Sequence, residues 1–306
     1  MAYTTIDDPS AYFHTRLYTS NNGELAVTNN ANSGDFQPDW IWIKDRGASN
    51  DHILSDTSRG ITKRLESNTS DAEGANSQDV KSVQSNGFTV GNNAGVNAGT
   101  SAHVAWQWKA NGGTTASNDD GNLTTTIQVN QTAGFSIVLW TSTGSSDTIG
   151  HGLGATPTVI IEKSRSAGST NWTFYTSVGG NKLMFLNNQN AVTTSFSGVS
   201  NVGSSIFTDG NGGTDTRVAY CFAPKQGYSK FGIFTGNGNA DGPFVYTGFK
   251  PAWIMVKNLT DSGDDWHIHD LARGTYNANN KRLKAKNETP KKKKKKKKDD
   301  NPMTIG

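Results

Sequence analysis

The sequence predicts an all-β protein of tandem antiparallel β-sandwich-like domains that arise from internal repeats, the third of them incomplete. Two observations support this prediction. An apolar run between a Pro and a Lys six residues later occurs three times, as Pro38–Lys44, Pro157–Lys163 and Pro251–Lys257. The 34 glycines, with many Asn, Ser and Thr residues, disfavour long helices and suit short strands joined by tight turns.

Each of these runs has the composition of a strand, because bulky and β-branched side chains favour strands and a Pro is tolerated at a strand's first residue. In the first run, Trp40 and Trp42 share one face while Ile41 and Ile43 share the other. Both faces are apolar, so we expect a second layer or an adjacent subunit to cover each side. We interpret the tryptophans as core residues rather than as platforms for stacking on sugars. The repeat-core positions are Pro38, Trp40, Trp42, Pro157, Ile161, Pro251 and Trp253.

Other segments align around the three runs. Upstream of each run lies an aromatic strand candidate: Tyr12–Thr19, Gly134–Thr141 and Gly227–Thr235. Downstream, two segments are shared by the first two copies only: Gly87–Val90 with Ser205–Thr208, and Val104–Trp108 with Val218–Phe222. The alternation of Val104, Trp106 and Trp108 predicts a strand half-buried in an antiparallel sheet.

These alignments divide the chain into unit one (1–111), a Gly/Thr/Ser/Asn-rich connector (112–132), unit two (133–225), unit three (226–289) and a Lys-rich tail (290–306). Unit three has no counterpart of the two downstream segments. A unit without its last strands leaves an unpaired sheet edge, which proteins normally hide. We hypothesise that strands from another chain or a neighbouring copy complete unit three by β-augmentation.

The net charge of +3 depends on the oligolysine tract Lys291–Lys298, and removing its eight charges leaves −5. Nucleic-acid binding is therefore not expected of the folded part. We interpret the tract as a solvated tail, the alternative being an electrostatic contact with an acidic partner or DNA. No segment has the ~20 apolar residues of a membrane helix. Cys221 is the only cysteine, which excludes an intrachain disulfide.

Several groups of polar residues were weighed as sites. Asp56 with Arg59, and Asp270 with Arg273, are expected to pair locally and brace a turn. His267 and His269 lie on one side of a strand, but no third ligand is evident, so we predict no metal site. The segments Gly150–Gly154 and Ser117–Asn122 resemble a phosphate loop and a calcium loop only superficially, and both are interpreted as turns.

Motifs for covalent or metal-assisted catalysis do not occur: there is no Gly-x-Ser-x-Gly, no His-Glu-x-x-His and no Cys pair. The carboxylates are scattered and mostly lie beside turn residues. We therefore predict no catalytic residue, no cofactor and no enzyme activity, a polysaccharide depolymerase being the least favoured alternative.

Taken together, these segments resemble a repeated domain of unassigned function that is common in virion proteins of marine bacteriophages. The resemblance covers most of residues 10–287. It is carried by the Gly-Phe-Ser-Ile-Val opening of unit two, Gly150–Pro157, Ile161–Arg165, Val218–Ala223 and Gly242–Trp253.

The resemblance implies a structural subunit of a phage virion, in a tail fibre or similar appendage, and it implies no catalytic residues. Its partners would be other virion proteins and further copies of itself, with a trimer expected by analogy. The alternatives are a capsid decoration or head-fibre protein and, in another class, a module that binds host glycans. The N-terminus lacks the features of a signal peptide, so we expect synthesis in the host cytoplasm and a place on the exterior of particles released by lysis.

Overall fold

The computed structural model describes residues 4–29, 36–194, 198–239, 241–274, 279 and 281–285, and within them the predicted all-β fold is confirmed. Strands that neighbour each other in the sheets are antiparallel. The one helical element of this part of the chain is a 3₁₀ turn, η1 (Pro9–Ala11), where the Asp8 carboxylate accepts a hydrogen bond from the Ser10 N–H. The oligolysine tract lies outside the described residues.

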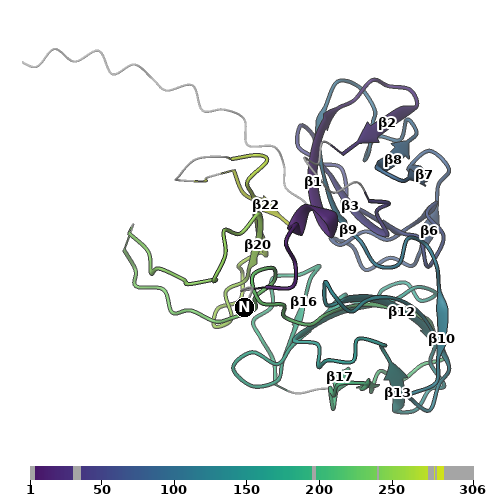
Figure 1. The fold of residues 1–306 in the computed structure, drawn as a ribbon, viewed down its shortest axis with the longest axis vertical. Coiled ribbons are helices and arrows are strands. Elements are labelled where there is room, and N and C mark those ends of the chain that lie inside the picture. The colour runs from purple at the N-terminus through teal and green to yellow at the C-terminus, as the bar shows by residue number, and fades with distance from the viewer. Residues whose placement is uncertain are drawn as a thin grey trace, which may run out of the picture.

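Unit one is a sandwich of two sheets that pack through an apolar layer (Figure 1). The four-stranded sheet has the order β1 (Phe13–Thr19), β9 (Ala102–Trp108), β3 (Trp40–Asp45) and β4 (Ile53–Asp56). The three-stranded sheet has the order β2 (Leu25–Thr28), β8 (Gly87–Val90) and β7 (Val80–Gln84). Ile41 and Ile43 of the first sheet meet Phe88 and Val90 of the second. A two-stranded ribbon, β5 (Lys63–Arg64) and β6 (Gly74–Ala75), follows β4.

Unit two contains a larger sheet and a second three-stranded sheet. The larger has the order β10 (Ala116–Asn118), β11 (Thr125–Asn130), β12 (Phe135–Thr141), β19 (Thr216–Phe222), β14 (Val159–Ser164), β15 (Thr173–Thr176) and β16 (Lys182–Phe185). The smaller has the order β13 (Asp147–Gly150), β18 (Ile206–Asp209) and β17 (Val199–Ser200). Segment 112–132 thus contributes β10 and β11 to this sheet instead of only connecting two units. Ile127, on β11, packs into the core between the two sheets, which its polar surroundings in the sequence did not suggest.

The strand orders of units one and two correspond. The order β1-β9-β3-β4 matches β12-β19-β14-β15, and β2-β8-β7 matches β13-β18-β17. Trp40 lies opposite Trp108 as Val159 lies opposite Phe222. The proposed match of Gly87–Val90 to Ser205–Thr208 is wrong by one residue, because the fully buried Phe88 corresponds to Phe207. An origin of this correspondence in duplication stays a prediction.

The described residues of unit three form one small sheet with the order β20 (Trp253–Val256), β21 (His267–Asp270) and β22 (Leu283–Lys284). These strands correspond to β14, β15 and β16. The strand predicted over Gly227–Thr235 is wrong, because this segment forms no strand. The physical reason is that its partner strand is missing from the described residues. The corresponding strands β1 and β12 pair with β9 and β19, and no equivalent of β9 or β19 exists among the described residues of unit three.

The three units meet at one shared apolar junction and lie around it as three groups of strands (Figure 1). Ring pairs join each unit to the next: Trp40 with Tyr220 at 4.2 Å, Phe174 with Trp266 at 4.3 Å, and Trp108 with Trp253 at 5.7 Å between centroids. Both faces of β3 are therefore covered from within the chain. The expectation of a half-buried β9 is wrong, because Trp253 of unit three and Phe222 of unit two cover its aromatic face and the smaller sheet of unit one covers the other.

No helix in the described ranges is both long enough and apolar enough to span a membrane.

Candidate functional site

The recurring Pro and Lys have distinct structural roles. Each strand begins two residues after its Pro, at Trp40, Val159 and Trp253. Trp40, Trp42 and Ile161 are then buried in the shared junction, and Trp253 packs against it. The recurring Lys points to the loop that follows the strand, where its ammonium donates to a backbone carbonyl. The pairs are Lys44 with Asn50, Lys163 with Thr170 and Lys257 with Asp264. Because a buried ammonium needs hydrogen-bond acceptors, the Lys holds each loop in place.

The two Asp–Arg pairs form at the ends of β4 and β21. Asp56 lies 2.5 Å from Arg59 and accepts its backbone N–H, and Asp270 and Arg273 have the same geometry. The guanidinium of Arg59 also donates to the carbonyl of Leu54, so the pair closes the turn after β4. All four side chains are buried, and none of them lines the hollow described below. Their arrangement is that of turn braces rather than of a catalytic site.

Each of these aspartates also receives a hydrogen bond from a different unit. The Tyr220 hydroxyl, on β19 of unit two, donates to Asp56 at 2.7 Å. Trp106 Nε1, on β9 of unit one, donates to Asp270 at 3.0 Å. Burial raises the pKa of Tyr220 well above its ordinary value, so its hydroxyl stays protonated and donates. Sequence analysis missed both contacts, because their partners are 164 residues apart.

A second set of contacts runs around the junction in the same sense. Trp172 of unit two donates to the Glu66 carbonyl of unit one, and Trp266 of unit three donates to the Phe185 carbonyl of unit two. At the corresponding place in unit one, His52 accepts a hydrogen bond from Trp42 Nε1. Burial lowers the pKa of His52 well below its ordinary value, and the backbone of Lys284 in unit three opposes that effect. In each unit, the ring residue that precedes β4, β15 or β21 therefore contacts the backbone of a neighbouring unit.

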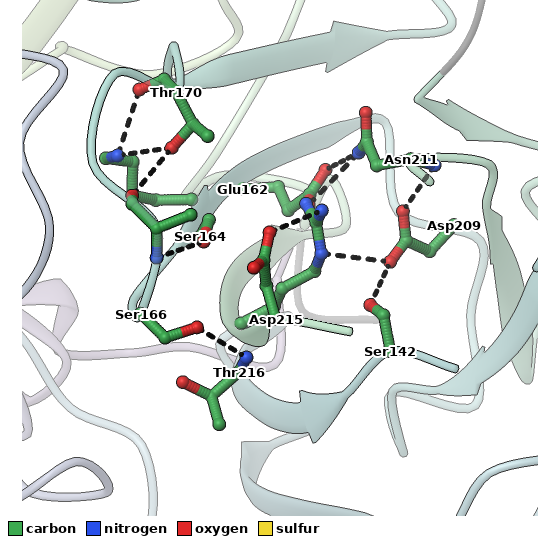
Figure 2. Close-up of polar contacts among 12 residues, drawn as sticks. Ser142, Glu162, Ser164, Ser166, Thr170, Asp209, Asn211, Asp215 and Thr216 are labelled. Atoms are coloured by element: carbon green, nitrogen blue, oxygen red, sulfur yellow. Dashed lines mark hydrogen bonds and ion pairs between the residues drawn. The ribbon is translucent and has the colours of Figure 1, made fainter. Parts of the chain in front are cut away.

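The principal polar feature of unit two is a buried cluster around Arg217 (Figure 2). Arg217 lies 2.5 Å from Glu162, 3.4 Å from Asp209 and 3.4 Å from Asp215. Asn211 donates to Glu162 at 2.9 Å. Strand register places Glu162 where unit one has Ile43, and Asp209 where it has Val90. An apolar contact of unit one is thus replaced in unit two by an ionic network.

This cluster has more carboxylates than cations. Burial, and then the charge of Asp209, raise the pKa of Glu162 to about 7 against the opposing effect of Arg217. Glu162 is 1% exposed, so a proton on it relieves the excess of negative charge in a site that water does not screen. The sequence signal was available, since an acidic residue stands at an inward position of a predicted strand. The arrangement fixes the loop between β18 and β19 onto β14.

Beside the cluster lies an open hollow of about 370 Å³. It is lined by Ser164, Thr170, Asn171, Thr173, Phe185, Asn211, Gly212, Asp215 and Arg217. The polar lining offers hydrogen-bond donors and acceptors, and Phe185 offers a half-buried ring. This composition can hold a polar ligand on the surface, and nothing in it resembles a nucleophile activated by a base.

The remaining sequence candidates behave as local structure. His267 and His269 lie on β21, and no cluster of three or more metal-binding side chains occurs in the part of the chain that the structure describes. His151 accepts the Leu153 N–H within the turn after β13. Asn118 accepts the Asp120 N–H in the turn after β10. Cys221 is buried, which raises the pKa of its thiol to about 12.

Comparison with known proteins gives a family and no function. The fold defines a layered, all-β protein with three groups of strands around one core. Residues 8–301 match the model of a family described as a Domain of unknown function (DUF7483), and the chain belongs to that family. No curated protein and no solved structure was found to be similar to it.

Replacing Tyr220 with Phe tests the contact between units one and two. The substitution removes the donor to Asp56 and keeps the ring, so we expect a loss of about 1.5–3 kcal/mol in the free energy of unfolding. Chemical denaturation measures it. The matched control is Tyr175→Phe, which removes a hydroxyl that donates to the neutral Asn181 within unit two. An equal loss in both variants would show that the contact between the units has no special weight.

Replacing Glu162 with Gln tests the buried cluster. The pKa of Glu162 is raised from 4.5 to about 7 in the folded protein, so the folded state binds the proton more tightly than the unfolded state. Its contribution is complete below pH 4.5 and is lost as pH rises to 7. Between pH 5 and 7.5 we expect the free energy of unfolding of the wild type to fall by roughly 1–3 kcal/mol relative to the variant. Parallel pH profiles for the two proteins would contradict this account.

Proposed function

We propose that the protein is a non-enzymatic structural subunit of a bacteriophage virion, in a tail fibre or other appendage that assembles through β-sheet faces and edges. Its partners are other virion proteins and further copies of the chain, and it lies on the exterior of the particle. The capsid decoration or head-fibre role is the alternative within the same class.

The observation that carries this proposal is the open side of unit three. Within the described residues, every large apolar side chain that is exposed falls between residues 233 and 254. They are Ile233, Phe234, Phe244, Val245, Tyr246 and Ile254. Exposed apolar side chains concentrated in one region mark a surface that binds another macromolecule. One edge of β20, in the same region, pairs with no strand of the described residues, and such edges pair with other chains.

The interior supports the same function. The polar side chains at the junction brace turns or join one unit to another. Such a network holds three units in a fixed arrangement, which is what a load-bearing part of a particle requires. The Asp–Arg pairs and the recurring lysines are not among the residues that line the hollow beside Arg217.

The location of the protein tests this proposal. We expect its peptides in mass spectra of phage particles purified by density-gradient centrifugation, and immunogold labelling at a single vertex or along an appendage. Labelling over the whole shell would instead favour the capsid alternative. Absence from particles, together with a monomeric state of the isolated protein at high concentration, would overturn the proposal.

Binding of a host glycan is a second candidate, favoured by the hollow beside Arg217. No tryptophan is exposed among the residues that the structure describes, and all eight lie there, so stacking of sugars on tryptophan does not support it. Phe185 and Asn171 of the hollow offer a ring and an amide instead. On a glycan array, Asn171→Ala should abolish any binding that Asn237→Ala, a distant exposed control, retains. Equal binding by both variants would exclude the hollow.

A further inference from the structure

We propose that unit three binds an extended segment of a second polypeptide, which supplies an inner strand beside β20 and an outer strand above it. The inner strand runs antiparallel to β20 and carries an aliphatic residue, a small residue and two aromatic residues separated by one position. This inference deepens the proposed assembly role and rests on it for the view that the second polypeptide is another structural subunit.

The edge of β20 that faces away from β21 has unused backbone groups. The Leu271 N–H donates to the Ala252 carbonyl at 3.0 Å, so the backbone of Ala252 and Ile254 points toward β21. Backbone direction alternates along a strand, so the N–H and C=O groups of Trp253 and Met255 point to the other edge. No strand of the described residues pairs with that edge.

Units one and two show what fills the corresponding edge. There β9 pairs with β3, and β19 pairs with β14. The residues that lie opposite the positions of Trp253, Met255 and Lys257 are Trp108, Trp106 and Val104 in unit one, and Phe222, Tyr220 and Val218 in unit two. Both strands therefore contain the sequence Val-Ala-aromatic-x-aromatic in the N-to-C direction. This is the side-chain pattern that the open edge fits.

The described residues of unit three also form no outer layer over β20. Ile41 of unit one and Ile160 of unit two are 0% exposed under β2-β8-β7 and β13-β18-β17, whereas Ile254 at the corresponding position is 44% exposed. Segment 243–247 takes the place in the chain of β2 and β13, yet it forms no strand, and its Phe244 and Tyr246 are 89% and 67% exposed. In units one and two this place pairs with β8 or β18, and no equivalent strand occurs in the part of unit three that the structure describes.

The hydrogen bonds around the junction indicate which residue fits the first of the two aromatic positions of the bound strand, the position of Trp106 and Tyr220. Trp106 of unit one reaches Asp270 of unit three, and Tyr220 of unit two reaches Asp56 of unit one. The same sense of rotation directs the bound strand to unit two, where strand register places Thr176 at the position of the two aspartates. Unit two therefore has no carboxylate to receive a donor. The first aromatic residue of the bound strand therefore needs no hydrogen-bond donor and can be Phe.

Within residues 1–306, the pattern Val-Ala-aromatic-x-aromatic occurs in β9 and β19 alone. Residues 286–306 contain no aromatic residue. In a second copy, β9 and β19 are buried within their own sheets and are unable to leave without unfolding them. A second folded copy therefore does not supply this strand, and we assign it to a segment of a different polypeptide.

A peptide with the sequence of residues 214–223, carrying Cys221→Ser and a fluorescent label, tests the inner strand against the full chain. We expect saturable binding, with a peptide of the same composition in scrambled order at least ten-fold weaker. Changing Tyr220, the first aromatic residue of the peptide, to Phe should alter the affinity less than two-fold, whereas Tyr220→Asp should abolish binding. Equal binding of the ordered and scrambled peptides, or none of either, would overturn the proposal.

Amide exchange followed by NMR locates the bound strand. On addition of the peptide, exchange at Trp253 and Met255 should slow at least ten-fold while exchange at Ile254 and Val256, already facing β21, stays unchanged. Uniform protection or protection elsewhere would overturn the proposed site.

A longer peptide, residues 204–223 with Cys221→Ser, tests the outer strand. Ile254→Lys changes an exposed position, so it should leave the melting temperature of the protein unchanged. It should lower the affinity for this longer peptide at least ten-fold and leave the affinity for the shorter peptide unchanged. Equal affinity of wild type and variant for the longer peptide would remove the outer strand from the proposal. Failure of peptide binding by a protein found in particles refutes this inference alone, whereas binding by a protein absent from particles refutes the virion role alone.

Discussion

The stacking of Trp40 on Tyr220, with ring centroids 4.2 Å apart, joins the large sheets of units one and two, and the rest of the molecule is arranged around this contact. The same Trp40 ring lies 4.4 Å from Trp108, and the Trp108 ring lies 5.7 Å from Trp253 of unit three. Burial of each large side chain contributes about 1.5–3 kcal/mol relative to exposure. The junction is therefore the main apolar core of the protein, larger than the layer inside either sandwich. The polar contacts then fix its orientation, because a hydrogen bond from Tyr220 or Trp106 forms only when the neighbouring unit is correctly placed.

The strands that sequence analysis predicted best are those in which consecutive residues are apolar, so that their burial follows from the local sequence. Trp40 and Ile41 alternate, so the apolar character of both faces was visible in the sequence and their burial followed from it. The Pro-to-Lys spacing located β3, β14 and β20 within two residues of their observed starts. The local Asp56–Arg59 geometry depends on a separation of three residues, which sequence patterns describe well.

The features that sequence analysis missed depend on partners far along the chain. Segment Gly227–Thr235 has the aromatic composition of a strand, but a strand needs a neighbour and its neighbour is missing. For β9, the alternation of large residues with Ala105 and Gln107 suggested one solvated face, whereas a second sheet covers it. Glu162 stood out as an acidic residue at an inward strand position, but Asp209 and the guanidinium that the two carboxylates share lie far along the chain, so the sequence did not show what they would contact.

One consequence of the shared junction concerns synthesis of the protein. Its last described contribution comes from Ala285, whose N–H donates to the Trp266 carbonyl at the far side of unit three. Until that residue has left the ribosome, the tryptophan face of β3 and β9 has no complete cover, however long ago those strands emerged. The nascent chain therefore carries an adhesive surface for most of its translation, and contacts so distant in sequence form slowly. Aromatic surface that stays exposed during synthesis favours aggregation, so the last residues of the junction protect the whole chain.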